Sequence, residues 1–245
     1  MHDSQNSGRR ERLRDNLEKT ILAQAEQTFA ASGFDGSSLA DIAAASGVSK
    51  QNLLYYFPSK LALYRRVLDD VLDDWLSEMQ VLAETTLPPR EALGAYLRAK
   101  LHFSRRRPHG SRVYALEVIT GAKTYGGDIK AKVVPALRAD IATLDRWIQA
   151  GQVRAISAQH LFFVIWAATQ AYADFAPQMQ LMLNRKTLSE KDFNEAFDTL
   201  QRLIDGIWAG DQMPVDAATA KTQASPSAPS AGVAKVRRKA TQKAT

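Results

Sequence analysis

Cysteine is absent from the 245-residue chain, and this absence excludes disulfide bonds and thiolate metal sites. Long apolar runs are absent as well. The longest, residues 161–168, is far shorter than the roughly 18 residues that a membrane-spanning helix needs. The polar N-terminal sequence MHDSQNSGRRERLRDN lacks the apolar segment of a secretory signal peptide. These absences predict a cytoplasmic protein without a membrane partner.

The residue patterns of common enzyme sites are also missing. The chain contains no nucleophile elbow and no phosphate-binding loop of the Gly-Lys-Ser/Thr type. The histidines lack metal-ligand spacing; they are His2, His102, His109 and His160. Glu117 or Asp174 could act as a lone general base, but neither has a partnered acid. We therefore predict no catalytic residue, no metal and no cofactor. A helical enzyme is the main alternative from another class.

Positive charge is concentrated at the C-terminal end. The formal net charge is +6, yet residues 1–60 hold seven Lys/Arg and seven Asp/Glu, whereas residues 211–245 hold six and two. The overall basicity therefore says little about DNA binding by the N-terminal part. Residues 211–245 contain no aromatic residue and are rich in Ala, Ser, Pro, Thr and Lys, so we expect a disordered tail. Such a basic tail either holds DNA loosely through phosphates or keeps the protein soluble.

Helical periodicity runs through the rest of the chain and predicts an all-α fold. Apolar residues repeat every four positions from Leu17 to Phe29, and the stripe stops at Gly33. Serines that can cap a helix come directly before five segments, at Ser38, Ser49, Ser59, Ser157 and Ser189. Further helices are predicted at about 90–106, 111–121 and 128–149.

Prolines and glycines mark where several predicted helices end. We expect Pro177 to close the helix that begins after Ser157, and the last helix to end near Trp208. No alternating strand pattern with hairpin turns is present.

A short helix lies within the sequence GVSKQNLLYYFPSK, residues 47–60. It follows a capped helix through a turn at Gly47, which is the arrangement of a helix-turn-helix. In that motif the first turn of the second helix reaches base edges in the major groove. Here that turn carries Lys50, Gln51 and Asn52; Lys suits guanine, and Gln and Asn suit adenine. A helical protein-interaction module without DNA contact is a third possibility, but nothing structural requires this polar triplet.

At residues 33–64, GFDGSSLADIAAASGVSKQNLLYYFPSKLALY, the chain resembles the TetR family of transcriptional repressors. This resemblance implies that the polar triplet reads bases and that Ser38, Tyr56 and Lys60 contact phosphates. The full DNA-contacting set that we predict is Ser38, Ser49, Lys50, Gln51, Asn52, Tyr55, Tyr56 and Lys60. The resemblance also implies a homodimer on a palindromic double-stranded operator.

The likeness continues beyond the DNA-binding segment. Residues 104–122, SRRRPHGSRVYALEVITGA, and 165–176, IWAATQAYADFA, are similar to pyrimidine-utilisation regulators of enteric bacteria, which sense uracil and thymine. This similarity implies uracil or thymine as the small-molecule effector, and another small aromatic or planar ligand is the alternative. The predicted division is a flexible arm at 1–14, a helix-turn-helix domain at 15–58, a helical ligand-binding and dimerisation domain at 59–210, and a basic tail at 211–245.

Side chains suited to a planar nucleobase share one face of the segment after Ser157. Gln170 lies one turn after Trp166, and its amide can pair with the imide edge of a uracil. Trp75 could add a stacking face, although both tryptophans could equally be ordinary core. Arg112 and Glu117 could form a polar wall or pair with each other. The predicted ligand-binding set is Trp75, Arg112, Glu117, Trp166, Gln170 and Asp174.

Overall fold

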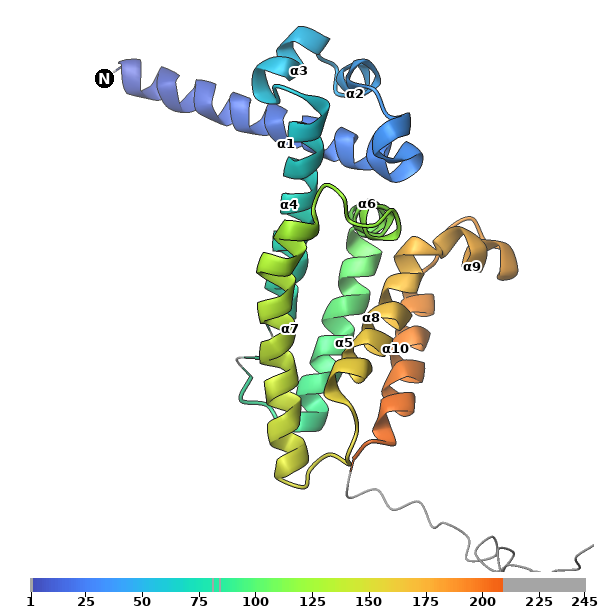
Figure 1. Ribbon diagram of the computed structural model, residues 1–245. Coiled ribbons are helices and arrows are strands. Elements are labelled where there is room, and N and C mark those ends of the chain that lie inside the picture. Colours follow the sequence, from blue (N-terminus) through green and yellow to red (C-terminus); the bar gives the residue numbers. More distant parts are fainter. Residues whose placement is uncertain (1, 81, 84, 209–245) are drawn as a thin grey trace, which may run out of the picture. The chain divides into compact units, whose positions relative to one another are not determined.

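Every regular element of the computed structural model is a helix within the residues that it describes, 2–80, 82–83 and 85–208 (Figure 1). The all-α prediction is confirmed. The ten helices of this part are α1 (His2–Gly36), α2 (Leu39–Ala45), α3 (Lys50–Tyr56), α4 (Lys60–Met79), α5 (Pro89–Arg106), α6 (Pro108–Ile119), α7 (Gly126–Gln149), α8 (Ala158–Asp174), α9 (Ala176–Met182) and α10 (Glu190–Asp205). None of the helices in these ranges is long and apolar enough to cross a membrane.

The five predicted serine caps are all present. In each case the serine hydroxyl accepts a hydrogen bond from the backbone N–H three residues later, which satisfies a donor that the first turn leaves unpaired. The caps are Ser38 for α2, Ser49 for α3, Ser59 for α4, Ser157 for α8 and Ser189 for α10. Local sequence therefore sets where half of the helices begin.

The structure differs from the predictions at three helix ends. First, α1 begins at His2, so the flexible arm predicted at 1–14 continues this helix. The segment RRERLR consists of good helix formers, and extending a helix is easier than starting one. Second, α8 ends at Asp174 and Pro177 lies in the first turn of α9, where a missing N–H costs nothing. Third, α10 ends at Asp205, and Trp208 instead forms an isolated β-bridge with Val153.

The N-terminal helices pack around a small core that holds α3 in place. Ile21 and Phe29 of α1, Ile42 of α2 and Leu53 of α3 are fully buried. Gly33 has a left-handed φ of 69°, and it breaks the regular part of α1 at the predicted position. The ring of Phe29 meets that of Tyr64 on α4 edge to face, with centroids 4.9 Å apart. The same core therefore fixes both the recognition helix and the start of α4.

α4 continues from this core into the remaining helices, as Figure 1 shows. Its buried face runs from Leu63 to Met79 and contacts α5 and α6. α8 lies against α5, α6 and α7, and α10 lies against α5. Helices α1 to α10 form one compact unit, and the predicted boundary at 58/59 falls at Ser59, the cap of α4. The predicted basic tail, 211–245, lies outside the described residues.

Candidate DNA-binding and ligand-binding sites

The first turn of α3 presents polar side chains to solvent on a buried anchor. Lys50, Gln51 and Asn52 are exposed, whereas Leu53 is fully buried against the N-terminal core. Ser49 holds the turn by accepting a hydrogen bond from the Asn52 backbone N–H at 3.1 Å. The three side chains are therefore held on a fixed backbone and point away from the protein, as base contacts require.

A tight turn joins α2 to α3. Gly47 has a φ of 70°, a conformation that residues with a side chain rarely adopt. The backbone N–H of Val48 donates to the Ala43 carbonyl at 3.0 Å, which closes the end of α2. The helix-turn-helix predicted from the sequence is therefore present in the geometry of the chain.

Two of the predicted phosphate contacts have internal partners. The Ser38 hydroxyl accepts from the Asp41 backbone N–H at 3.1 Å and donates to the Asp41 carboxylate at 2.7 Å. The Lys60 ammonium donates to the carbonyls of Phe34 at 2.8 Å and Ser37 at 3.0 Å, and it lies over the Phe34 ring.

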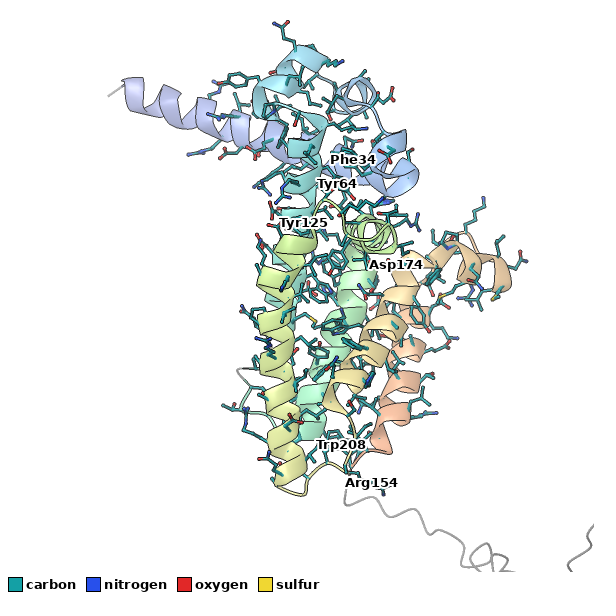
Figure 2. The ribbon with its side chains drawn as sticks, viewed as in Figure 1. Phe34, Tyr64, Tyr125, Arg154, Asp174 and Trp208 are labelled. Carbon is teal, nitrogen blue, oxygen red and sulfur yellow. The ribbon has the colours of Figure 1, made fainter. Side chains whose placement is uncertain are left out.

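The Lys60 ammonium is therefore largely occupied within the protein. It binds the Phe34 carbonyl in the last turn of α1 and the Ser37 carbonyl that follows this helix, and one N–H is left for a phosphate. Its contact with a phosphate stays a prediction. Figure 2 shows Phe34 and Tyr64 close together at the start of α4. Tyr55 remains 73% exposed and Tyr56 is half-buried, with their rings 5.5 Å apart. Contacts from these tyrosines to phosphates stay predictions.

A small cavity lies between α4, α5, α6 and α8. Its lining is mostly aromatic and aliphatic and includes the predicted residues Trp75 and Gln170; the others are Val71, Leu72, Phe103, Ser111 and Tyr114. About 10 Å³ is open to the centre of a water molecule, which is room for about one water. A six-membered ring therefore needs the walls of this cavity to move apart.

Aromatic rings form much of the surroundings of this cavity. The ring of Trp75 is nearly parallel to Tyr114, with centroids 6.3 Å apart, and meets Trp166 edge to face at 5.4 Å. The Trp166 indole N–H donates to the Tyr96 hydroxyl at 2.7 Å. By contrast, the buried indole nitrogen of Trp75 has no hydrogen-bond partner within the described ranges. The structure thus brings Trp75, Trp166 and Gln170 together, as predicted.

Two of the polar residues predicted for the pocket, Asp174 and Arg112, make hydrogen bonds where α6 meets the end of α8. Asp174 accepts a hydrogen bond from Ser111, which lines the cavity, at 2.6 Å. It lies at the end of α8 that faces α6 (Figure 2). Arg112 donates weakly to the Ala173 carbonyl at 3.4 Å. Burial raises the pKa of Asp174, although the Ser111 hydrogen bond and the charges of Arg112 and Lys100 oppose this shift.

Glu117, like Arg112, Trp166 and Asp174, is not among the residues that line the cavity, so its contact with a ligand stays a prediction. One of its oxygens accepts from the backbone N–H groups of Thr124 at 2.7 Å and Tyr125 at 2.9 Å. The other accepts from the Tyr64 hydroxyl at 3.0 Å. The buried carboxylate therefore joins α4 to the α6–α7 connection. The described residues show no ion pair between Glu117 and Arg112.

Sequence reasoning missed two charged residues in the interior, Lys100 of α5 and Asp140 of α7. Lys100 is 2% exposed, and its ammonium lies 4.1 Å from the Trp75 ring centroid and 5.5 Å from that of Trp166. Burial raises the pKa of Asp140 to about 7, against a hydrogen bond from Tyr96 and the charge of Lys100. Both positions could have been found from the spacing of apolar residues. Lys100 lies three residues after Leu97 on α5, and Asp140 lies four residues before Leu144 on α7, so each shares the buried face of its helix.

A second cluster that the sequence did not reveal surrounds Arg107, at the junction of α5 and α6. Its guanidinium donates to the carboxylates of Glu26 on α1 at 2.7 Å and of Asp70 and Asp74 on α4 at 2.6 and 2.9 Å. We call these four residues the Arg107 cluster. Its arginine side chain is 16% exposed. The cluster ties the DNA-binding helices to α4 and to the helices around the cavity.

Comparisons with known proteins match two successive parts of the chain. Residues 21–67 match the family described as bacterial regulatory proteins, tetR family, and residues 68–209 match the C-terminal region of YcdC-like proteins. The chain is 39% identical over 198 residues to the HTH-type transcriptional regulator RutR of Escherichia coli (strain K12), covering 81% of this chain and 93% of that protein.

Solved structures show the same fold at low identity. The ketosteroid transcriptional regulator KstR2 of Mycobacterium tuberculosis aligns with a TM-score of 0.66 at 18% identity, covering 78% of this chain and 94% of that one. AibR in complex with isovaleryl coenzyme A and operator DNA aligns with a TM-score of 0.62 at 16% identity, covering 78% of this chain and 100% of that one.

Proposed function

Since the chain belongs to the tetR family of bacterial regulatory proteins, we propose that it is a homodimeric repressor that a pyrimidine base releases from its operator. The matched family and the relationship to RutR make it a DNA-binding transcriptional regulator, not an enzyme. Its cytoplasmic location, its effector and its assembly belong to the proposal. The observation that carries the choice of ligand is the amide of Gln170 in an aromatic cavity with Trp75.

The proposed reading of DNA uses the exposed first turn of α3. Lys50, Gln51 and Asn52 contact base edges, and Tyr55 and Tyr56 position the helix on phosphates. Ser38 and Lys60 contribute mainly by holding the ends of α2 and α1. In this proposal the exposed triplet determines sequence specificity, and Ser38 and Lys60 stabilise the helices that hold the triplet in place.

The proposed homodimer uses the outer surfaces of α8 and α10. Both helices pack on α5, yet they leave Phe163, Val164 and Leu203 exposed at 40, 64 and 71%. A second copy of the chain would bury these side chains, and the exposed Ala167 would let the helices approach closely. Two-fold symmetry then places the two α3 helices on successive turns of a pseudo-palindrome.

We expect twice the chain mass in sedimentation equilibrium at micromolar concentration. Val164→Glu puts a charge into the proposed interface and should yield monomers, because a buried, unpaired carboxylate is costly. Leu87→Glu is the matched control, since Leu87 is 45% exposed and lies outside α8 and α10. A monomeric wild type, or equal dissociation by both variants, would show that the interface lies elsewhere or does not exist.

The proposed ligand is uracil or thymine. The Gln170 amide supplies one acceptor and two donors, which match an imide N–H and the adjacent carbonyl. Trp75 and Tyr114 offer apolar faces for a planar ring. The resemblance of residues 104–122 and 165–176 to pyrimidine-utilisation regulators supports the same ligand. Another small planar molecule with an imide-like edge is the second candidate, because the aromatic walls do not select for a particular ring.

Release from DNA follows from the small size of the cavity. A pyrimidine fits only if its walls separate, and one wall belongs to α4, which starts directly after the recognition helix. Trp75 lies about 24 Å along α4 from its cap, so a small tilt at the cavity becomes a larger shift of α3. The ligand then favours a spacing of the two α3 helices that the operator does not.

Gln170→Leu should weaken uracil binding roughly 10- to 100-fold and leave operator binding unchanged. The substitution keeps the approximate side-chain volume but removes the amide that pairs with the N–H and carbonyl of the bound ring. Leaving buried polar groups unpaired typically costs about 1–3 kcal/mol. Thermal shift measures the binding, because a ligand of the folded state raises the melting temperature. DNA release is followed by fluorescence anisotropy of a labelled operator.

Gln149→Leu on the exposed end of α7 is the matched control and should behave as the wild type. If Gln170→Leu is still released by uracil at wild-type concentrations, the cavity is not the ligand site. If no pyrimidine protects the wild type from heat, the ligand assignment fails and the DNA-binding regulator remains.

A further inference from the structure

We infer that Lys100 is a ligand-binding residue of the small cavity between α4, α5, α6 and α8. Its amine donates a hydrogen bond to a ring carbonyl oxygen of the ligand. The inference rests on the proposed function, because it concerns the same cavity. It adds a contact to the proposed ligand: Gln170 pairs with the ring N–H and one adjacent carbonyl, which leaves the second carbonyl oxygen of the ring without a donor. Lys100 supplies that donor.

The first observation is that the Lys100 amine is buried without a hydrogen-bond partner. Its residue is 2% exposed, and its nitrogen has no partner anywhere in the part of the chain that the structure describes. A buried donor without an acceptor costs free energy, so native proteins seldom leave one unpaired. A ligand oxygen would supply the missing acceptor.

The second observation is the position of the amine. It lies over the rings of Trp75 and Trp166, and Trp75 is itself a wall of the cavity. The indole nitrogen of Trp75 is the other buried donor of this region that lacks a partner. Two unpaired donors beside one cavity point to a ligand that is rich in acceptors.

The charged groups around Lys100 do not remove this need. Burial lowers its pKa, and the carboxyls of Asp174 on α8 and Asp140 on α7 oppose the shift. The Asp174 carboxylate has a hydroxyl donor of its own, Ser111 at 2.6 Å, and the described residues show no ion pair between Lys100 and either carboxyl. Protonated or neutral, the amine keeps at least two N–H donors.

The amide of Gln170 cannot by itself select a two-carbonyl ring. Rotation of the amide by half a turn exchanges its donor and acceptor, so it can pair with the edge of uracil or with that of cytosine. The protonated Lys100 amine donates only and therefore demands an acceptor. Lys100 is thus a residue that can make the site specific for ring oxygens.

A thermodynamic cycle between the ligand oxygens and the lysine tests the inference. Full-length wild type and Lys100→Met are titrated with uracil, 2-thiouracil and 4-thiouracil, in which sulfur, a weaker acceptor, replaces one oxygen at a time. In the wild type we expect one of the two thio compounds to bind about fivefold or more weakly than uracil. In Lys100→Met uracil itself should bind about tenfold more weakly, and that thio compound should bind as well as uracil.

Lys132→Met is the matched control, since it removes the same charge from a lysine that bridges Asp69 and Asp73 on α4. It should retain the wild-type ratios. If Lys100→Met does not fold, as judged by circular dichroism and operator binding, Lys100→Leu takes its place in the same cycle. Its side chain carries no hydrogen-bond donor, so it should also lose the preference for oxygen.

Equal uracil affinity in wild type and Lys100→Met would overturn the inference and leave the proposed function intact. Weaker binding with unchanged thio ratios would also overturn it, because a purely structural lysine changes all three affinities alike. If no pyrimidine binds the wild type, both the proposed function and the inference fail.

Discussion

Replacing Lys50 by alanine in both subunits should weaken operator binding by about 2–6 kcal/mol, because each of two half-sites loses a base contact worth roughly 1–3 kcal/mol. Gln51→Ala should have an effect of the same size at its own base pair. The reason is structural: both side chains are exposed on a turn that Ser49 and the buried Leu53 hold in place. Anisotropy titrations at constant salt, on the operator and on a scrambled duplex, give the specific and nonspecific affinities.

Two substitutions of exposed residues in other segments serve as controls, one for the loss of charge and one for the loss of the amide. Lys123→Ala removes the same charge as Lys50→Ala, and Gln152→Ala removes the same amide as Gln51→Ala. Both controls should bind the operator as the wild type does. Loss of affinity that is equal on both duplexes would mean that Lys50 contacts only phosphates. An unchanged operator affinity would mean that α3 does not read bases.

Arg107→Met should lower the free energy of unfolding by about 3–5 kcal/mol, the usual cost of removing one partner of a largely buried charge cluster. Glu26 on α1 and Asp70 and Asp74 on α4 would then lose the cation that they share. Asp70 is 42% exposed, so water will partly replace its lost partner. Urea denaturation, followed by circular dichroism, measures the change. The variant should also respond less to ligand, because the Arg107 cluster links α1 to α4.

Arg105→Met provides the comparison, since Arg105 is 45% exposed and its ion pair within the described residues is with the exposed Glu190. Its cost should be about 0–1 kcal/mol. Equal costs for the two variants would show that the Arg107 cluster adds no more than a surface ion pair.

Acid should reduce the difference in the free energy of unfolding between wild type and Arg107→Met. Burial tends to raise the pKa of Asp74, but hydrogen bonds from Arg106 and Arg107 outweigh it and lower the pKa from 3.8. A carboxyl whose pKa is lower in the folded than in the unfolded state stabilises the fold when the pH is above the unfolded-state pKa. This contribution is lost as the pH falls through the folded-state pKa. The difference between the two unfolding free energies should therefore shrink as the pH falls below 3.8.

The sequence by itself determined the features that depend on neighbouring residues. The helix starts followed from five serine caps, and the turn before α3 followed from Gly47. The exposed triplet at Lys50 followed from its place in the first turn of the second helix of the motif. Trp166 and Gln170 face the same region because helical spacing places them one turn apart. These interactions span three or four residues, so periodicity and capping are enough to predict them.

Only the tertiary structure decided which distant side chains meet. Arg107 and Glu26 are 81 positions apart, and their ion pair depends on the packing of α1 beside α6. Packing also directs the Glu117 carboxylate to Tyr64 and away from the cavity, and it turns Lys60 toward Phe34. It closes the cavity to about one water and buries Lys100 over two indoles. The cause is that helix packing sets which side chains share the interior, and no local pattern encodes that choice.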